Sequence, residues 1–427
     1  MFKINKKFHV CLLLTLGGFV SGSACAETLK DAFSKAYVHN AKLNSERVAV
    51  RIAGEDVAVA RSGFLPQIEG VGSYVRNNGI TGSDNAVGTI GIKLNQRIFD
   101  GFVTQNTFFS AQVKMQAQRE YFRNVEQNVF LDVVTAYTNV YQARRIADLR
   151  RENLVALEEQ VRANKARLDV GEGARVDFAQ AQAARSVAVS DLMLARANVK
   201  SAEAAYRQVI GYDPKKLERP PVAEDLPVSL DAAEKMGVIM HPAILYAKYL
   251  IDASAYNVKA KEGALLPKVD FSATRSYNKI YSGLGEDGAS HSVGILVSVP
   301  IFEGGRTSAQ MRQSKEQLGQ ARIQLDLAHS NIRQALTSAW FQFEGAQASV
   351  VAYRESVRAA EIAFKGRVQE NRVGQATTLD VLNSRSQLIN AQIALITAEC
   401  NAVVASYNVQ SSIGKLTADY LGLKIIK

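Results

Sequence analysis

The histidines and one glycine-rich loop are the residues of this chain whose types and spacing could do chemistry. His39, His241, His291 and His329 lie far apart and lack the spacing of metal ligands. Residues 283–288 match the dinucleotide-binding pattern G-x-G-x-x-G. Dinucleotide binding needs this pattern at a turn from a strand to a helix. Here acidic residues lie inside the loop, and no helix is expected after it. Neither G-x-S-x-G nor H-E-x-x-H occurs. We therefore expect no catalytic, cofactor-binding or metal site.

Two aspartates beside corresponding turns are the remaining candidates for a functional site. Asp177 follows the turn 170–173, and Asp380 follows the turn 373–376. A glycine after a helix end is typical of a left-handed cap, and an acid in the first turn of the next helix stabilises its free N–H groups and its dipole. Each aspartate is therefore either a capping acid or a carboxylate that acts in a site at the turn.

The N-terminus has the pattern of a secretory signal peptide. Three lysines precede an apolar stretch at 10–20, and an A-x-A cleavage pattern ends at Ala26. This stretch is too short to span a bilayer permanently. We therefore predict a signal peptide over 1–26. Cleavage after Ala26 is favoured over lipidation of Cys25, because a lipobox normally has a large aliphatic residue where Gly22 stands.

The composition of the chain is that of a folded protein, with 47% hydrophobic and 22% charged residues. Removal of 1–26 takes away three lysines and no acid, which lowers the net charge from +10 to +7. This charge supports an anionic partner only weakly, and no nucleic-acid partner is predicted. Cys400 is the one cysteine after residue 26, so no intrachain disulfide can form. No later segment has eighteen consecutive apolar residues, so a membrane role requires β-strands or a peripheral anchor.

The proline positions indicate where long helices can form. No proline occurs between 67 and 213 or after 300. The tracts 102–168 and 306–372 are rich in helix-forming residues, and each would extend about 100 Å. A short turn follows each tract, and a second helix is predicted over 176–210 and 379–413. The last helix carries a heptad pattern in which Cys400 is a core position. The chain is therefore mainly α-helical, with two long hairpins of a coiled coil or a tube.

The two halves of the chain repeat each other. Residues 98–101 match 301–304, and Asp177 matches Asp380, at an offset of 203, whereas 65–66 match 266–267 at an offset of 201. Equal offsets over several separate blocks indicate an internal duplication. The predicted organisation is a signal peptide 1–26, a first repeat 27–211 (a helix, two barrel strands and a helical hairpin), a proline-rich linker 212–228 packed on the outside, a second repeat 229–414 and a C-terminal tail 415–427.

Each half also contains a pair of strand-like runs before its long helix. Apolar and polar residues alternate over 90–98 and 293–301, and earlier runs lie at 68–75 and 269–277. Polar, glycine-rich loops are predicted at 77–86 and 278–290. If the strands span a membrane, four are too few to close a barrel, and an open edge in lipid leaves backbone groups unpaired. Two, three or four copies would then give 8, 12 or 16 strands.

The chain resembles the TolC family of outer-membrane efflux proteins over nearly its whole length after the signal peptide. The resemblance rests on the duplicated plan, Leu-Pro before each first strand, Ile-Phe-acid-Gly after each second strand, and Val-Gly…Leu-Asp-Val-Leu at 373–382. It implies a homotrimer whose strands build a 12-stranded transmembrane β-barrel in the outer membrane and whose helices continue it as a periplasmic α-helical barrel. The expected function is a passive exit duct of a tripartite efflux or type I secretion system.

The resemblance also implies partners and site residues. The hairpin tips would dock to a periplasmic adaptor and an inner-membrane pump of RND, ABC or MFS type; the tip residues are Val170, Gly171, Val373 and Gly374. An acidic entrance would use Asp380, while a second family aspartate falls on Asn383, and the other hairpin keeps Asp177. The tyrosine and arginine of the family's latch correspond to Asn371 and Ala376, which puts that latch in question.

A periplasmic coiled-coil adaptor is the alternative function. It would share the signal peptide and a helical hairpin. Adaptors usually carry one hairpin flanked by compact β-domains, whereas this chain has two hairpins and little β structure outside the paired strands. The sequence names neither the substrate, be it a drug, a siderophore or a protein, nor the particular pump, nor whether the entrance rests open or closed.

Overall fold

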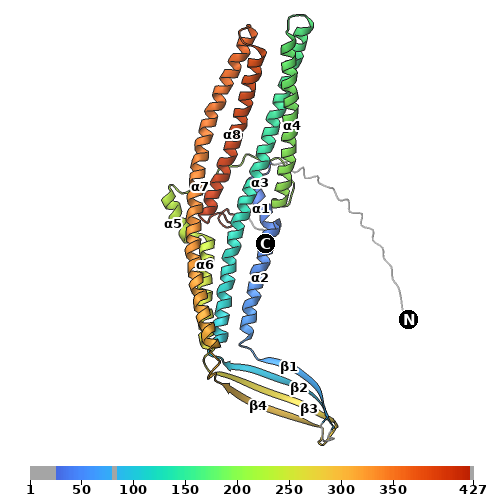
Figure 1. Cartoon of the computed structure of the whole chain (residues 1–427), viewed down its shortest axis with the longest axis vertical. Helices are drawn as coiled ribbons and strands as arrows, with labels where there is room; N and C mark the ends of the chain where they lie inside the picture. Colours follow the sequence, from blue (N-terminus) through green and yellow to red (C-terminus); the bar gives the residue numbers. More distant parts are fainter. Residues whose placement is uncertain (1–25, 79–83, 424–427) are drawn as a thin grey trace, which may run out of the picture.

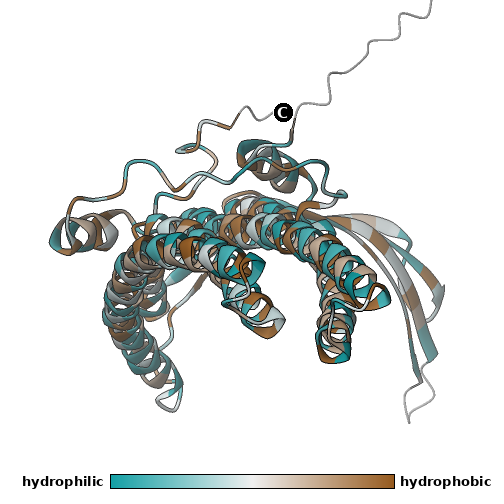
Figure 2. Cartoon of the chain, turned by 90° about the horizontal axis from the view of Figure 1, so that it is seen from above, coloured by the Kyte–Doolittle hydropathy of each residue, from teal (hydrophilic) through white to brown (hydrophobic). Residues whose placement is uncertain are grey.

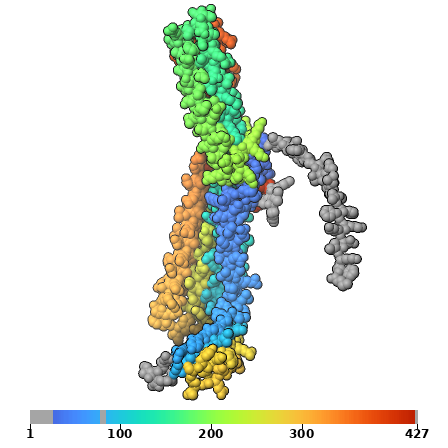
Figure 3. Space-filling view, turned by 90° about the vertical axis from the view of Figure 1, so that its right-hand side faces the viewer, coloured from blue at the N-terminus to red at the C-terminus, as the bar shows by residue number. Residues whose placement is uncertain are grey.

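The structure, a computed structural model, is a long and narrow molecule with helices along most of its length and a sheet at one end (Figure 1, Figure 3). It describes residues 26–78 and 84–423. The predicted signal peptide as far as Cys25, which includes the proposed lipidation site, the loop 79–83 and residues 424–427 lie outside the described residues.

The residues that the structure describes contain eight helices, which follow the same order and have nearly the same lengths in the two halves. The long helices have 67 residues each, and the shorter helices before the strands have 11 and 22 residues in both halves. The predicted long helices agree with the observed bounds to within one residue. The helices are α1 (Leu29–His39), α2 (Ala41–Ser62), α3 (Val103–Asp169), α4 (Arg175–Ile210), α5 (Leu230–Met240), α6 (Pro242–Gly263), α7 (Arg306–Arg372) and α8 (Thr378–Ser412).

The single helix predicted at the start of the first repeat is two helices, and the prediction was wrong in this detail. Asn40 separates α1 from α2, and its side-chain oxygen accepts hydrogen bonds from the N–H groups of Lys42 and Leu43. His241 has the same place between α5 and α6, where Pro242 is the first helical residue. A side chain that caps a new helix and a proline that lacks an N–H both favour a break at this point.

The four strands form one antiparallel sheet in the order β1-β2-β3-β4. They are β1 (Gln67–Asn78), β2 (Asp84–Phe99), β3 (Lys268–Ser282) and β4 (Gly288–Ser298). β2 and β3 come from different halves of the chain and pair along most of their length. In the part of the chain that is described, β1 pairs only with β2, and β4 pairs only with β3.

The register gathers the apolar side chains on one face of the sheet, because cross-strand partners share a face. The apolar face carries Ile68, Tyr74, Ile90, Ile92, Leu94, Val269, Phe271, Ala273, Val293, Ile295 and Val297. Arg275 and its partner His291 interrupt the middle of this face, and the paired Arg76 and Asp84 and Lys279 lie at the end of it near the loops. The other face is largely polar and includes an ion pair of 3.1 Å between Arg97 and Asp270. One apolar and one polar face are what the wall of a transmembrane barrel needs.

The strand ends differ from the predicted ones. β1, β2 and β3 extend into the predicted polar loops, so that the turn after β3 is only residues 283–287. β4 ends at Ser298, although the apolar alternation continues to Ile301. Pro300 has no N–H to donate to a neighbouring strand, which explains why the strand stops before it.

The helices form a curved wall when the molecule is viewed along its length, with the connecting segments over the outer side of the curve (Figure 2). α3 packs with α4 and α7 with α8 as two hairpins, α8 lies beside α3, and α6 lies between α3 and α7. By length and composition alone, α8 is apolar enough to cross a membrane. It packs along α7 over most of its length, however, so we assign it to the helical wall.

The linker, α1 and the C-terminal segment pack together at the middle of the molecule (Figure 1). Leu416 and Ala418 of the predicted tail belong to the same buried cluster as Phe130 of α3. The side chain of Tyr137 is fully buried, and its single O–H is shared between the carbonyl oxygens of Glu27, at 2.6 Å, and Glu218, at 2.9 Å. These contacts attach both the start of the chain and the linker to the helical wall.

Candidate functional site at the hairpin tips

Both hairpin tips lie at the end of the molecule opposite the sheet (Figure 1). In the first tip, the N–H groups of Gly171 and Glu172 donate to the carbonyl oxygens of Leu168, at 3.0 Å, and Arg167, at 2.9 Å. This pair of bonds is the Schellman motif, which requires a left-handed residue, and Gly171 has a φ of +80°.

The second tip has the same geometry. The N–H groups of Gly374 and Gln375 donate to the carbonyl oxygens of Asn371, at 3.2 Å, and Glu370, at 2.8 Å, and Gly374 has a φ of +76°. Val170 and Val373 precede the glycines and are each 70% exposed. Each tip therefore holds an apolar side chain out to solvent on a rigid turn, as a surface for a protein partner requires.

Asp380 is a capping acid in this structure. The Asp380 carboxylate accepts from the N–H of Thr377 at 2.9 Å and from its hydroxyl at 2.7 Å, and the Asp380 N–H donates to the Thr377 hydroxyl oxygen at 3.2 Å. These bonds form a capping box at the start of α8. The side-chain and then the backbone bond with Thr377 lower the pKa of Asp380 below its ordinary value, so the carboxylate is ionised at neutral pH.

Asp177 occupies the matching position in α4 without the same cap. The residue before that helix is Ala174, which has no side chain that can cap it. The backbone carbonyl of Asp177 instead accepts from the Asn164 amide of α3 at 3.1 Å. Asn383, the position of the second expected acid, is exposed on the next turn after Asp380. The structure thus places Asp177 and Asp380 in matching first turns of two different hairpins.

The two positions that correspond to the family latch bond to each other. The Asn371 amide donates to the backbone carbonyl oxygen of Ala376 at 2.9 Å. The bond spans the turn between α7 and α8 and is local to one hairpin. Neither this bond nor the separate bond from Asn164 to the Asp177 carbonyl was predicted from the sequence. The signal was the presence of an asparagine near the end of both long helices.

A contact between the two hairpins lies further along α8. The Arg385 guanidinium donates through Nε to the side-chain oxygen of Asn153 on α3 at 2.8 Å, and it lies 5.6 Å from the ring of Phe364 on α7. No carboxylate pairs with Arg385 within the described residues. Arg385 therefore joins the α7–α8 hairpin to α3 by a hydrogen bond and an aromatic contact.

The four histidines lie on different elements of the described chain: His39 in α1, His241 between α5 and α6, His291 in β4 and His329 in α7. No group of histidine, cysteine, aspartate and glutamate side chains there could hold a metal ion. Residues 283–287 form the turn between β3 and β4, and Leu284 in that turn is fully exposed. No helix follows it, so the geometry of a dinucleotide site is absent from this turn.

Comparisons with known families match both halves of the chain. The model of the outer membrane efflux protein family matches residues 32–212 and again residues 239–415. A relative from Brucella suis, the outer membrane efflux protein BepC, is 50% identical over 429 aligned residues, which cover 100% of this chain and 94% of that protein.

More distant relatives and solved structures agree with this match. Outer membrane protein TolC of Escherichia coli is 26% identical, with 97% of this chain and 87% of that protein covered. The proteases secretion protein PrtF of Dickeya chrysanthemi is 25% identical over 96% of this chain and 93% of that protein. The solved structure of CusC superposes with a TM-score of 0.80 at 17% identity, covering 91% and 92% of the two chains. VceC of Vibrio cholerae superposes with a TM-score of 0.76 at 17% identity, covering 90% and 96%.

Proposed function

This chain belongs to the outer membrane efflux protein family, and we propose that three copies of it close one channel whose hairpin tips dock against a periplasmic adaptor. The chain is an outer-membrane protein with a large periplasmic helical part, and its role is that of an exit duct for efflux or type I secretion. The family consists of channels rather than enzymes. Membership therefore favours the duct over the periplasmic adaptor.

The observation that carries the proposal is the four-stranded sheet with one apolar face and two open edges. In lipid, each unpaired backbone N–H or C=O costs several kcal/mol. Pairing β4 of one copy with β1 of the next satisfies both edges. Three copies give 12 strands, which is within the range of closed outer-membrane barrels.

The helices support the same assembly. Ile52 and Val59 on α2 are exposed by 58% and 70%, although both are apolar. Their equivalents in the second half are Ala253 and Ala260 on α6, which are buried because α6 lies between α3 and α7. α2 packs on α3 alone among the long helices that are described. A neighbouring copy that placed its α7 against α2 would bury the exposed residues.

We also propose the functional division of the chain. The repeats 27–211 and 229–414 each supply two strands and one hairpin, and the linker 212–228 joins them. The tips at Val170, Gly171, Val373 and Gly374 take the adaptor, because they combine exposed valines with rigid turns. The adaptor would connect the duct to an inner-membrane pump of RND, ABC or MFS type, and the channel itself stays passive.

The test concerns Asp380, which we propose as the entrance carboxylate of each copy, with Asn383 and Asp177 nearby on the two hairpins. A ring of three carboxylates attracts cations at the narrow end of a pore. Asp380→Asn removes the charge and keeps an oxygen that can accept from Thr377. In planar bilayers, we expect this variant to lose cation selectivity and to need about tenfold more multivalent cation for block.

Thr377→Ala is the matched control, because it removes the capping hydroxyl and leaves the charge. It should weaken the start of α8 by about 1 kcal/mol and leave ion selectivity unchanged. If Asp380→Asn conducts with the selectivity and block of the unchanged chain, Asp380 is a capping acid and has no role at the entrance.

A further inference from the structure

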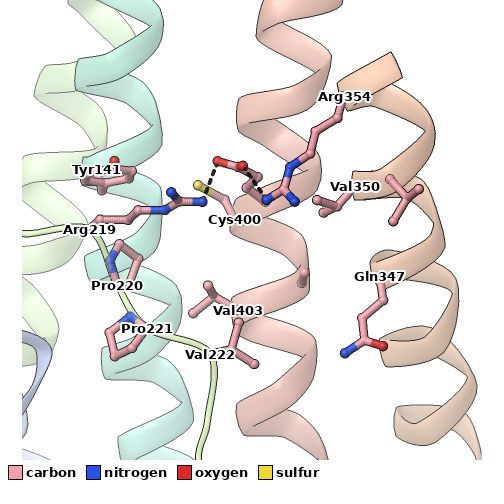
Figure 4. A pocket seen from close by; sticks show the side chains of 13 residues that line it. Tyr141, Arg219, Pro220, Pro221, Val222, Gln347, Val350, Arg354, Cys400 and Val403 are labelled. Carbon is pink, nitrogen blue, oxygen red and sulfur yellow. Dashed lines mark hydrogen bonds and ion pairs between the residues drawn. The ribbon is translucent and has the colours of Figure 1, made fainter. Parts of the chain in front are cut away.

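A cavity of about 550 Å³ lies on the linker side of the helical wall, between the linker and helices α3, α7 and α8 (Figure 4). Its walls are mostly apolar and come from four segments: Tyr141 from α3, Pro220 and Val222 from the linker, Val350 from α7, and Val403 from α8. A volume of this size is typical of small-molecule sites. The cavity is therefore large enough to take the apolar part of a ligand.

Two arginines and one glutamate make the charged part of the cavity, and Gln347 adds an amide. The Glu399 carboxylate pairs with Arg219 of the linker at 2.9 Å and with Arg354 of α7 at 3.3 Å (Figure 4). Neither guanidinium has another ion pair in the described segments. Two positive charges on one negative charge leave a net charge of +1, and each guanidinium has five N–H donors, of which Glu399 uses few.

We propose that this cavity binds an amphiphilic anion, with its carboxylate on Arg219 and Arg354 and its alkyl or aryl part against the apolar walls. Guanidinium groups bind carboxylates in a bidentate manner, which gives a strong and directional contact. Burial of the apolar part adds a hydrophobic contribution that grows with the area removed from water. A cation of the same shape cannot make the contact between carboxylate and guanidinium, and the excess positive charge of the site repels it.

The site is distinct from the hairpin tips and from the proposed docking of an adaptor. Glu399 follows Gly374 by 25 residues along the chain, which corresponds to roughly 37 Å of helix. The linker closes one side of the cavity, so a bound anion would tie the linker to α7 through Arg219 and Arg354. The cavity is thus a point at which a ligand connects the two halves of one copy.

Glu399 has the role of an internal competitor in this arrangement. Its negative charge offsets one of the two positive charges that would attract the carboxylate of a ligand. Replacement by glutamine removes the negative charge and raises the net charge of the site to +2. Glu399→Gln should therefore tighten the binding of an anion, whereas a residue that merely supports the fold would weaken binding when replaced.

The experiment uses the full exported channel in amphipol, with octanoate as the probe and octylammonium as its cationic match. Titration calorimetry measures binding. The reactivity of Cys400 provides an independent measurement, because its thiol lines the cavity and is the one cysteine after residue 26. Burial raises the pKa of Cys400 to about 11, so its reaction with a small disulfide reagent is slow and depends on access. Octanoate should slow this reaction at least about fivefold, and octylammonium should not.

Two variants that should change octanoate binding in opposite directions complete the test. Arg354→Gln should weaken octanoate binding about tenfold, and Glu399→Gln should strengthen it by a similar factor. Arg358→Gln is the control, because Arg358 lies one turn along α7 and pairs with Glu355 of its own helix. Equal protection by octanoate and octylammonium, an absence of protection, or weaker binding after Glu399→Gln would each overturn the proposal. Ion conductance through the channel is a separate readout, so failure here leaves the proposed duct function intact.

Discussion

Glu126 of α3 is a carboxylate that the fold buries almost completely beneath the C-terminal segment. It is 4% exposed, and one of its oxygens accepts from the Ala418 N–H at 3.3 Å. Burial raises its pKa from 4.5 to about 7, and the nearby charge of Asp419 adds to the rise. The Ala418 bond and the positive charges of Arg123 and Arg47 act in the opposite direction. Glu126 is therefore close to half protonated at neutral pH.

The raised pKa predicts how the packing of the C-terminal segment depends on pH. The folded chain holds the proton up to about pH 7, whereas the unfolded chain loses it near 4.5, so stability falls as the pH rises between these values. The full loss is roughly 3 kcal/mol. Glu126→Gln keeps an acceptor for Ala418 and removes the titration. We expect the unchanged chain to release its C-terminal segment to a protease faster at pH 8 than the variant does, with little difference at pH 5.

The control for this prediction is Glu361→Gln, because Glu361 is only partly buried on α7 and no ion pair holds it in the described structure. It should leave the pH dependence of cleavage unchanged. A Glu126→Gln variant that is cleaved at the same rate as the unchanged chain at both pH values would show that Glu126 does not control the C-terminal segment.

The two hairpins are separate elements, and few side-chain bonds fix one against the other near the tips. Arg385 of α8 makes such a bond with Asn153 of α3 and also contacts Phe364. Arg367 is also close to the tip of the second hairpin, but it pairs with Glu370 of its own helix at 2.7 Å. These two arginines therefore allow a matched comparison of contacts between elements and within one element.

Arg385→Lys should loosen the first turns of α8 relative to α3. Lysine keeps the positive charge but lacks the planar guanidinium that donates to Asn153 and stacks on Phe364. Loss of a partly buried hydrogen bond to a charged group costs about 1.5 kcal/mol, so amide exchange in the first turns of α8 should accelerate about tenfold. Arg367→Lys should leave exchange there within about twofold. Equal exchange rates in the two variants would contradict this role of Arg385.

The internal repeat of the whole molecule predicts how one copy meets the next. Within the chain, Ile92 of β2 lies opposite Arg275 of β3. Ile92 corresponds to Ile295 of β4 at the offset of 203, and Arg275 corresponds to Tyr74 of β1 at the offset of 201. The pair equivalent to Ile92 and Arg275 is therefore Ile295 and Tyr74. In one copy, β2 and β3 lie between β1 and β4, so the distance from β1 to β4 is about 14 Å. Ile295 therefore lies opposite Tyr74 of the partner subunit if the barrel closes as we propose.

A pair of cysteines tests this register. Tyr74→Cys with Ile295→Cys should form disulfides under mild oxidation and give covalent trimers on denaturing gels. A disulfide needs Cα atoms within about 7 Å, so the link cannot form inside one copy. Ile68→Cys with Ile295→Cys is the control, because Ile68 is on the same face but six residues away on β1. The proposed closure would be refuted if both cysteine pairs gave equal amounts of covalent oligomer, or if the pair at 74 and 295 stayed monomeric on the gel.

The sequence by itself determined the local elements and their repetition. Proline-free tracts rich in helix formers defined α3 and α7 to within a residue, because helix formation depends on neighbours a few positions away. The alternation around Ile92 and Ile295 identified the strands for the same reason. The repeat of Asp177 at Asp380 located both hairpin tips. The family resemblance then led to the duct function.

The tertiary structure alone decided which distant residues meet. Glu126 is buried beneath the C-terminal segment, which returns to it 292 positions later along the chain. Arg219, Arg354 and Glu399 come from three elements, and no spacing in the sequence joins them. Such contacts depend on how helices pack and where the linker crosses them. Those distances are set by the summed burial of many side chains, which no local pattern encodes.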